Sequence, residues 1–298
     1  MLWVLLALIS FFMFAVSNII DKILITKFLR SSLALTASFG LFGIVFSIIL
    51  FISVGIPSIP FVYLIAALLS GFFLVSSIIF YVKSLSMEEA SRVIPLWHLT
   101  ALFTLILAVI FLDEVLTPLK YAAFASILVG GFIISAKHVR KTFRLSPALA
   151  FMLLSSFLLA ISDILLKFAH NAGMLWQIFF AFYLGANLSQ LSLFILPSIR
   201  KNALKAFSKH RHNFVVILFL SAAFGFFAQL LLNNAILLGP ITLIASFVSF
   251  QSLFVLMLAT FLSIKFPLLL KEAISFKTIR VKLAAIALMA FGLLLLLV

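Results

Sequence analysis

The chain has 298 residues, of which 66% are hydrophobic and only 9% are charged, and its formal net charge at pH 7 is +14. Because an ordinary soluble domain is roughly 25% charged, this composition excludes a water-soluble fold. The Lys and Arg residues stand between apolar stretches, which favours a role in membrane orientation over nucleic-acid binding, and the absence of Cys excludes disulfides and thiolate metal sites.

Apolar runs between charged or proline-containing breaks predict ten transmembrane helices, each near the length of about 20 residues that crosses the hydrocarbon core of a bilayer. The fold class is therefore an all-α integral membrane protein. In chain order the predicted spans are residues 2–25, 32–54, 60–83, 90–112, 118–136, 147–169, 174–196, 213–237, 241–264 and 279–298.

The basic residues are distributed unevenly among the connections between these spans. All Lys and Arg residues except Lys120 and Lys167 belong to the odd-numbered connections. By the positive-inside rule these connections face the cytoplasm, which places both termini of the ten-span chain outside. We expect a multi-pass protein of the cell inner or plasma membrane. The basic stretches are short and lack stacking aromatic residues, so nucleic acid is not an expected partner.

An internal repeat divides the chain into residues 1–140 and 146–298. Residues 15–22 align with residues 160–167 at a separation of 145, and residues 114–117 align with residues 272–275 at a separation of 158. Five spans per repeat is an odd number, so the second repeat would enter the membrane upside down relative to the first. Such inverted-topology repeats are typical of transporters that bind substrate near the midplane, where the repeats meet.

The first and sixth spans carry matching polar residues. Asp163 and Lys167 are four residues apart and share a helix face, and their equivalents in the first repeat are Asn18 and Lys22. One interpretation is an ion pair at the membrane interface. The other is that these faces line the entrance and lower wall of a substrate cavity, because ionisable groups inside spans tend to mark transport pathways.

The fourth span contains Pro95, Trp97 and His98, and the proline predicts a bent helix. His98 lies about 12 Å into the span at 1.5 Å per residue. It is expected either to pack through a hydrogen bond or to line a cavity as a proton-responsive group, whereas metal binding is not favoured. Trp97 is expected either in the core or in an aromatic wall of the cavity.

Uncharged amides in the second half allow two interpretations. Gln229 and Asn233 share one face of the eighth span, and Gln251 lies near the middle of the ninth. They could bind zwitterions or sugars, or they could join helices. Asn187 and Gln190 in the seventh span are expected to join helices.

Glycines are expected where helix backbones approach closely, because the missing side chain leaves room for the neighbouring helix. The glycines assigned this role are Gly40, Gly43, Gly130, Gly131 and Gly225.

The sequence resembles the EamA-like family of the drug/metabolite transporter superfamily. The resemblance rests on Ser17-Asn18 and Lys22 in the first span, Pro95 in the fourth, the stretch 111–117 and a glycine-bearing fifth span. It implies ten helices in two inverted five-helix halves and the transport of small metabolites, with amino-acid exporters and nucleotide-sugar carriers among the relatives. Many relatives keep both termini in the cytoplasm, opposite to the orientation that the charges predict here.

We therefore predict a secondary transporter that moves small polar or amphipathic metabolites by alternating access, with amino acids or related compounds as the first guess and export as one direction. The alternatives are a lipid or lipid-linked-sugar translocator of the same fold and a non-transporting scaffold. No P-loop or cluster of carboxylates indicates an enzyme, and no cofactor is expected. The expected partners are a small-molecule substrate and membrane lipids, and the expected state is a monomer or weak homodimer. Proton coupling through Asp21, His98 or Asp163 and facilitated diffusion both remain open.

Overall fold

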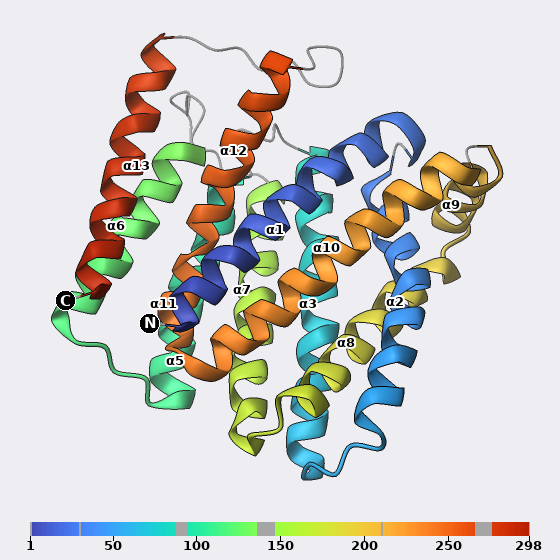
Figure 1. The fold of residues 1–298 in the computed structure, drawn as a ribbon, viewed down its shortest axis with the longest axis horizontal. Coiled ribbons are helices and arrows are strands. Elements are labelled where there is room, and N and C mark those ends of the chain that lie inside the picture. Colours follow the sequence, from blue (N-terminus) through green and yellow to red (C-terminus); the bar gives the residue numbers. More distant parts are fainter. Residues whose placement is uncertain are drawn as a thin grey trace.

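The chain folds into a bundle of helices (Figure 1). The computed structural model describes residues 2–29, 31–87, 94–135, 147–209, 211–265 and 276–297, and no strand occurs within these ranges. The elements in chain order are α1 (Leu2–Leu24), the π-helical turn η1 (Ile25–Leu29), α2 (Ser32–Val54), α3 (Phe61–Met87), the 3₁₀ segment η2 (Ile94–His98), α5 (Leu99–Leu112), α6 (Pro118–Ser135), α7 (Pro147–Ala169), η3 (His170–Ala172), α8 (Leu175–Ser192), η4 (Leu193–Ile195), α9 (Pro197–Lys209), α10 (Arg211–Leu238), α11 (Ile241–Ser246), α12 (Val248–Lys265) and α13 (Phe276–Leu297).

Seven helical segments of the described chain are apolar and long enough to cross a membrane. Three shorter apolar helices, Leu96–Leu112, Pro118–Ile133 and Ala284–Leu296, fall within the predicted fourth, fifth and tenth spans. The structure therefore confirms an all-α membrane protein. The number of ten crossings stays a prediction, because it depends on these three shorter helices.

Local sequence explains where several helices begin and end. The Ser31 hydroxyl accepts a hydrogen bond from the backbone N–H of Ala34 at 3.3 Å and so caps the start of α2. Gly55, with φ of 72°, ends the same helix, a conformation that glycine adopts without steric cost. Asp113 ends α5 in the left-handed region, with φ of 50°.

Helices from the two halves of the chain are interleaved in the bundle (Figure 1). The most extensive contacts join α1 to α10 and α12, α7 to α3 and α5, α6 to α13, and α8 to α2 and α3. Each of these contacts pairs a helix from the first half with one from the second. The interior of the bundle is therefore built by both halves together.

Serine hydroxyls bond across the α1–α10 and α3–α7 contacts in matching positions. Ser17 Oγ lies 2.9 Å from Ser221 Oγ, and Ser70 Oγ lies 3.1 Å from Ser162 Oγ. In each pair, the backbone carbonyl of either serine also lies within 3.5 Å of the partner's hydroxyl and is an alternative acceptor. Ser17 and Ser162 are 145 residues apart, as the sequence alignment predicts, and Ser70 and Ser221 are 151 residues apart.

A second pair of contacts obeys the same two separations. Ser10 Oγ donates to the carbonyl of Ala228 at 2.7 Å, and Ser155 Oγ donates to the carbonyl of Ser77 at 2.8 Å. The two donors are again 145 residues apart and the two acceptors 151. The α1–α10 and α7–α3 contacts therefore share one register over at least two helical turns.

Two segments differ from the sequence predictions, and a third agrees with them. The basic connection between the predicted seventh and eighth spans contains an α-helix, α9. The predicted ninth span is interrupted at Phe247, between α11 and α12. The described part of the predicted fourth span begins at Ile94 as a 3₁₀ segment that includes Pro95, in agreement with the predicted irregularity there.

The predicted glycine contacts are largely confirmed. A Cβ atom added at Gly40, Gly43, Gly130 or Gly131 would lie within 3.1 Å of a neighbouring helix. The prediction for Gly225 is wrong, because the nearest atom to an added Cβ would be 4.0 Å away. The atom at that distance is the Ser17 hydroxyl oxygen of α1, so an alanine side chain fits at Gly225 without displacing it.

Candidate functional site

One face of α7 carries a line of polar side chains through the interior. Ser156, Asp163 and Lys167 of α7 are followed by His170, the first residue of η3, and the four are seven, four and three residues apart, so they lie on one side of the continuous helical segment. From Ser156 to His170 this line extends about 21 Å at 1.5 Å per residue. We refer to these four residues as the α7 polar face.

Ser156 and Asp163 of this face bond to η2 and α5 of the first half. Asp163 accepts a hydrogen bond from the Thr104 hydroxyl of α5 at 3.4 Å. Ser156 donates to the carbonyl of Leu96 in η2 at 3.2 Å. An ionised carboxylate has about four lone-pair positions, so Asp163 can accept further hydrogen bonds.

Lys167 bonds to the end of α10. Its ammonium group donates to the carbonyls of Ile236 at 2.6 Å and Gly239 at 2.8 Å. A helix leaves its last four carbonyls without intrahelical partners, and a cation is favourable at this negative end. Lys167 therefore caps α10, so the structure directs the Asp163 and Lys167 side chains to different partners.

Glu114 forms hydrogen bonds with the turn that connects α10 to α11. Its carboxylate oxygens accept hydrogen bonds from the backbone N–H groups of Ile241 at 2.9 Å and Thr242 at 3.0 Å, at the start of α11. The turn between α10 and α11 is thus held by Lys167 of one half and Glu114 of the other. This capping role follows only from the tertiary contacts.

Buried polar groups around these elements have unused hydrogen-bonding capacity. Among the described residues, neither ring nitrogen of His170, nor the side-chain oxygens of Asn233 and Thr242, has a hydrogen-bond partner. All three side chains are buried. Buried polar groups are normally paired, so these atoms could form hydrogen bonds with a polar ligand.

Trp97 and His98 lie in η2 and have different environments. Trp97 is half-buried and packs edge-on against Tyr81, with ring centroids 4.4 Å apart. His98 is only 1% exposed, and its Nδ1 lies 3.4 Å from the Ser249 hydroxyl of α12. Its ring also contacts Phe132 of α6. These contacts favour a packing role for His98.

The first-repeat residues Asn18 and Lys22 are exposed on α1. Their neighbour Asp21 accepts a short hydrogen bond from Ser221 of α10. Ser10, Ser17 and Asp21 therefore make polar contacts between α1 and α10, while Asn18 and Lys22 are left accessible.

The amides of the second half are divided between the interior and helix contacts. Asn233 is fully buried and its NH₂ donates to the carbonyl of Gln229, one turn earlier. The Gln229 and Gln251 side chains are half-buried. Asn187 joins α8 to α2, donating to the Gly43 carbonyl at 2.8 Å and to the Ser47 hydroxyl at 2.7 Å, which confirms its predicted role.

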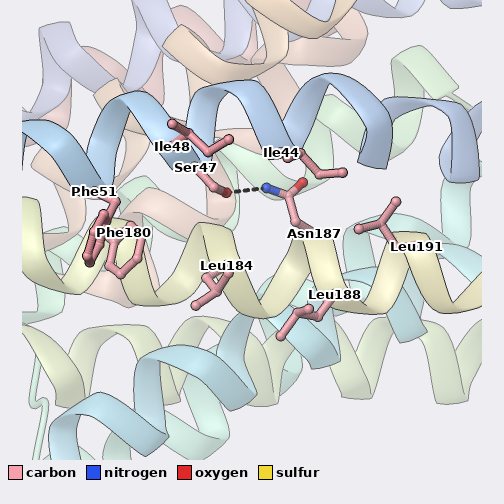
Figure 2. Close-up of a pocket in the computed structure, with 9 residues that line it drawn as sticks. All are labelled: Ile44, Ser47, Ile48, Phe51, Phe180, Leu184, Asn187, Leu188 and Leu191. Atoms are coloured by element: carbon pink, nitrogen blue, oxygen red, sulfur yellow. Dashed lines mark hydrogen bonds between the residues drawn. The ribbon is translucent and has the colours of Figure 1, made fainter. Parts of the chain in front are cut away.

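Two apolar hollows lie beside α2 and α8. The smaller, of about 270 Å³, is lined by both helices and has the Asn187–Ser47 hydrogen bond at its wall (Figure 2). The larger, of about 970 Å³, lies between α2, the start of α8 and α10. Its lining is mainly apolar and includes Phe46, Trp176 and Phe226.

Sequence reasoning did not single out Thr104, Ser156 and His170. Ser156 and His170 could have been found by extending the face of Asp163 and Lys167 along the helix. Thr104 is one hydroxyl among many in an apolar span, and only its contact with Asp163 distinguishes it. Within the described part of the chain, no group of three or more His, Asp or Glu side chains could hold a metal ion.

Comparison with known proteins agrees with this architecture. Residues 1–136 match the model of the EamA-like transporter family. No curated protein matches the chain. A solved crystal structure of a protein has a TM-score of 0.63 and 13% sequence identity, over 98% of this chain and 94% of that one, which shows a shared fold. Residues 1–136, somewhat less than half of the chain, therefore match the EamA-like transporter family, which is part of the drug/metabolite transporter superfamily.

Proposed function

We propose that this protein is a secondary carrier that moves small polar or amphipathic metabolites across the cell inner or plasma membrane by alternating access. The observation that carries this proposal is the α7 polar face, which lies inside an apolar bundle and meets groups from both halves of the chain. Polar side chains at such a depth are costly unless they serve a pathway or a fixed contact.

Amino acids or related zwitterions are the first substrate class that we propose. A zwitterion needs an acceptor for its ammonium group and a donor for its carboxylate. Asp163 has capacity as the acceptor, because Thr104 supplies it with only one hydrogen bond, at 3.4 Å. Asn18 and Lys22 are accessible donors on α1.

The remaining residues proposed to contact substrate belong to η2, α10 and α12. Trp97 would form an aromatic wall with the packed His98 ring supporting it, and Gln229, Asn233 and Gln251 would supply amides. Lys167 would act at the edge of the site by holding the end of α10. Asp21, His98 and Asp163 are the candidate proton sites if transport is coupled to protons. The proposed carrier is a monomer or a weak homodimer.

The serine contacts support an inverted repeat of residues 1–140 and 146–298. Two independent contacts obey the separations of 145 and 151 residues, as repeated units predict. The sequence alignment gives separations of 145 near the start of the repeat and 158 near its end. The value of 151 lies between them, so the separation between equivalent residues increases along the repeat. With ten spans, substrate would bind where the repeats meet.

Solute exchange from proteoliposomes tests this proposal. Vesicles loaded with isotope-labelled amino acids, nucleosides and sugars should lose one class faster than protein-free vesicles. Asp163→Asn should then reduce that exchange at least tenfold, while the matched change Asp113→Asn, at an exposed helix end, should leave it near the wild-type rate. Equal effects of the two substitutions on exchange would contradict the proposed site.

The large apolar hollow favours a second candidate, a lipid or lipid-linked-sugar translocator. Its volume of about 970 Å³ and its position between α2, α8 and α10 suit the hydrocarbon part of an amphipathic cargo. A flipping assay with fluorescent lipids separates the two functions. Flipping without exchange of any soluble solute would support the translocator and contradict the metabolite carrier.

A further inference from the structure

The helix α9 is amphipathic and is anchored by its apolar side. Ile199, Ala203 and Ala206 are buried. Ile199 and Ala206 belong to a second hydrophobic cluster, separate from the main core, which also contains Leu24 and Phe214. This cluster fixes α9 against η1, the start of α2 and α10.

The opposite side of α9 combines basic and apolar residues. Arg200, Lys201 and Lys205 are exposed, and Leu204, which is 59% exposed, lies within the same helical arc. Just before the helix, Ile195 is 79% exposed. An apolar residue surrounded by cations is typical of a helix that lies in the membrane interface.

Further cations come from the end of α1 and from η1, which lies beside α9 (Figure 1). Lys22 and Lys27 are both exposed. No acidic residue occurs in residues 22–29 or 192–212. We call Lys27, Arg200, Lys201 and Lys205 the basic surface; Lys22, proposed above as a substrate contact, is not counted in it.

We propose that the basic surface binds the headgroups of anionic phospholipids in the adjoining leaflet. Ammonium and guanidinium groups complement lipid phosphates. The neighbouring carboxylate, that of Asp21, is half-buried and accepts a hydrogen bond from Ser221, so no exposed acidic residue in residues 21–29 or 192–212 offsets this charge. Leu204 would enter the boundary between headgroups and acyl chains. The helix would thus be held on one side by the protein and on the other by lipid.

Site-specific quenching in nanodiscs tests the proposal. Because the chain contains no Cys, Ser208→Cys gives a unique fluorophore position on α9. A reference label at Thr117→Cys lies at the other end of the bundle, between α5 and α6. Phosphatidylcholine nanodiscs would contain a small fraction of spin-labelled phosphatidylglycerol or, in parallel samples, spin-labelled phosphatidylcholine.

We expect phosphatidylglycerol to quench the α9 label more strongly than phosphatidylcholine, with no such preference at the reference label. Lys201→Gln and Lys205→Gln should each lower the preference about fivefold, since each cation near the surface contributes about 1 kcal/mol. Lys205→Arg should retain the preference, and Lys120→Gln, a control at the other end, should not change it. Salt at about 1 M should abolish it, because the Debye length is then about 3 Å.

Equal quenching of the α9 label by the two lipids would overturn the proposal. So would a preference for phosphatidylglycerol that survives removal of both lysines. Since the readout is lipid proximity, neither outcome depends on whether the protein transports a metabolite.

Discussion

Gly185→Ala tests the close contact between α3 and α8. An added Cβ at Gly185 would overlap the backbone carbonyl oxygen of Leu68 and lie 2.8 Å from the attached carbon. Gly71 on the facing helix is enclosed in the same way by the backbone of Phe182 and Ala186. Because the obstructing atoms are backbone, no side-chain rotation can make room.

The expected cost follows from this geometry. If α3 and α8 separate by about 0.5 to 1 Å, the atoms that line the gap lose roughly a quarter to a half of their dispersion energy. Overpacking of this kind typically costs about 1–3 kcal/mol. Alanine is better than glycine inside a helix by about 1 kcal/mol, which offsets part of the loss. Because the obstructing atoms are backbone, we take the upper end of the overpacking range, about 3 kcal/mol. Subtracting the helical preference of alanine leaves a net destabilisation of about 2 kcal/mol.

Thermal unfolding of the detergent-purified protein provides the assay. Gly225→Ala is the matched control, since its added Cβ would meet nothing closer than 4.0 Å and should gain only the helical preference of alanine. Gly185→Ala should lower the Tm by several degrees, while Gly225→Ala should leave it unchanged or slightly higher. If both substitutions shift the Tm equally, close backbone packing does not distinguish these positions and the reasoning fails.

Two further predictions concern polar contacts between helices. Lys167→Met should destabilise the protein by about 2 kcal/mol, because the carbonyls of Ile236 and Gly239 lose hydrogen bonds to a charged group, and such bonds contribute about 1.5–3 kcal/mol. Lys167→Arg should recover part of the Tm. An unchanged Tm in Lys167→Met would show that the cap is dispensable. Ser70→Ala and Ser162→Ala should each cost about 0.6 kcal/mol, as interhelical hydrogen bonds in membranes do on average. Measured as a double-mutant cycle, the two changes should cost less together than their sum, and strict additivity would show that the hydroxyls do not act as a pair.

Much of the architecture could be predicted from local properties of the chain. Long apolar runs predict membrane helices because burial in hydrocarbon requires a continuous hydrogen-bonded backbone. The separation of 145 residues, read from a few polar matches, reappears in the contacts of Ser17 and Ser162. The irregular start of the fourth helix followed from Pro95.

The candidate site was predicted less completely. The shared face of Asp163 and Lys167 follows from helical spacing and is present in the structure. Their partners could not be predicted, because Thr104 lies 59 residues from Asp163, and the carbonyls that bind Lys167 lie 69 and 72 residues away. A side chain's partners depend on which helices pack together, and helical spacing carries no information about that.

The sequence by itself determined that this is a helical membrane protein, where its apolar segments lie and which residues share a helix face, since these depend on composition and on neighbours a few positions away. Only the tertiary structure decided that residues 197–209 form a docked helix, that the ninth span breaks at Phe247, and that Gly185 is crowded while Gly225 is not. The physical reason is that docking, breaks and close approach depend on the surface of the neighbouring helix, which comes from the other half of the chain.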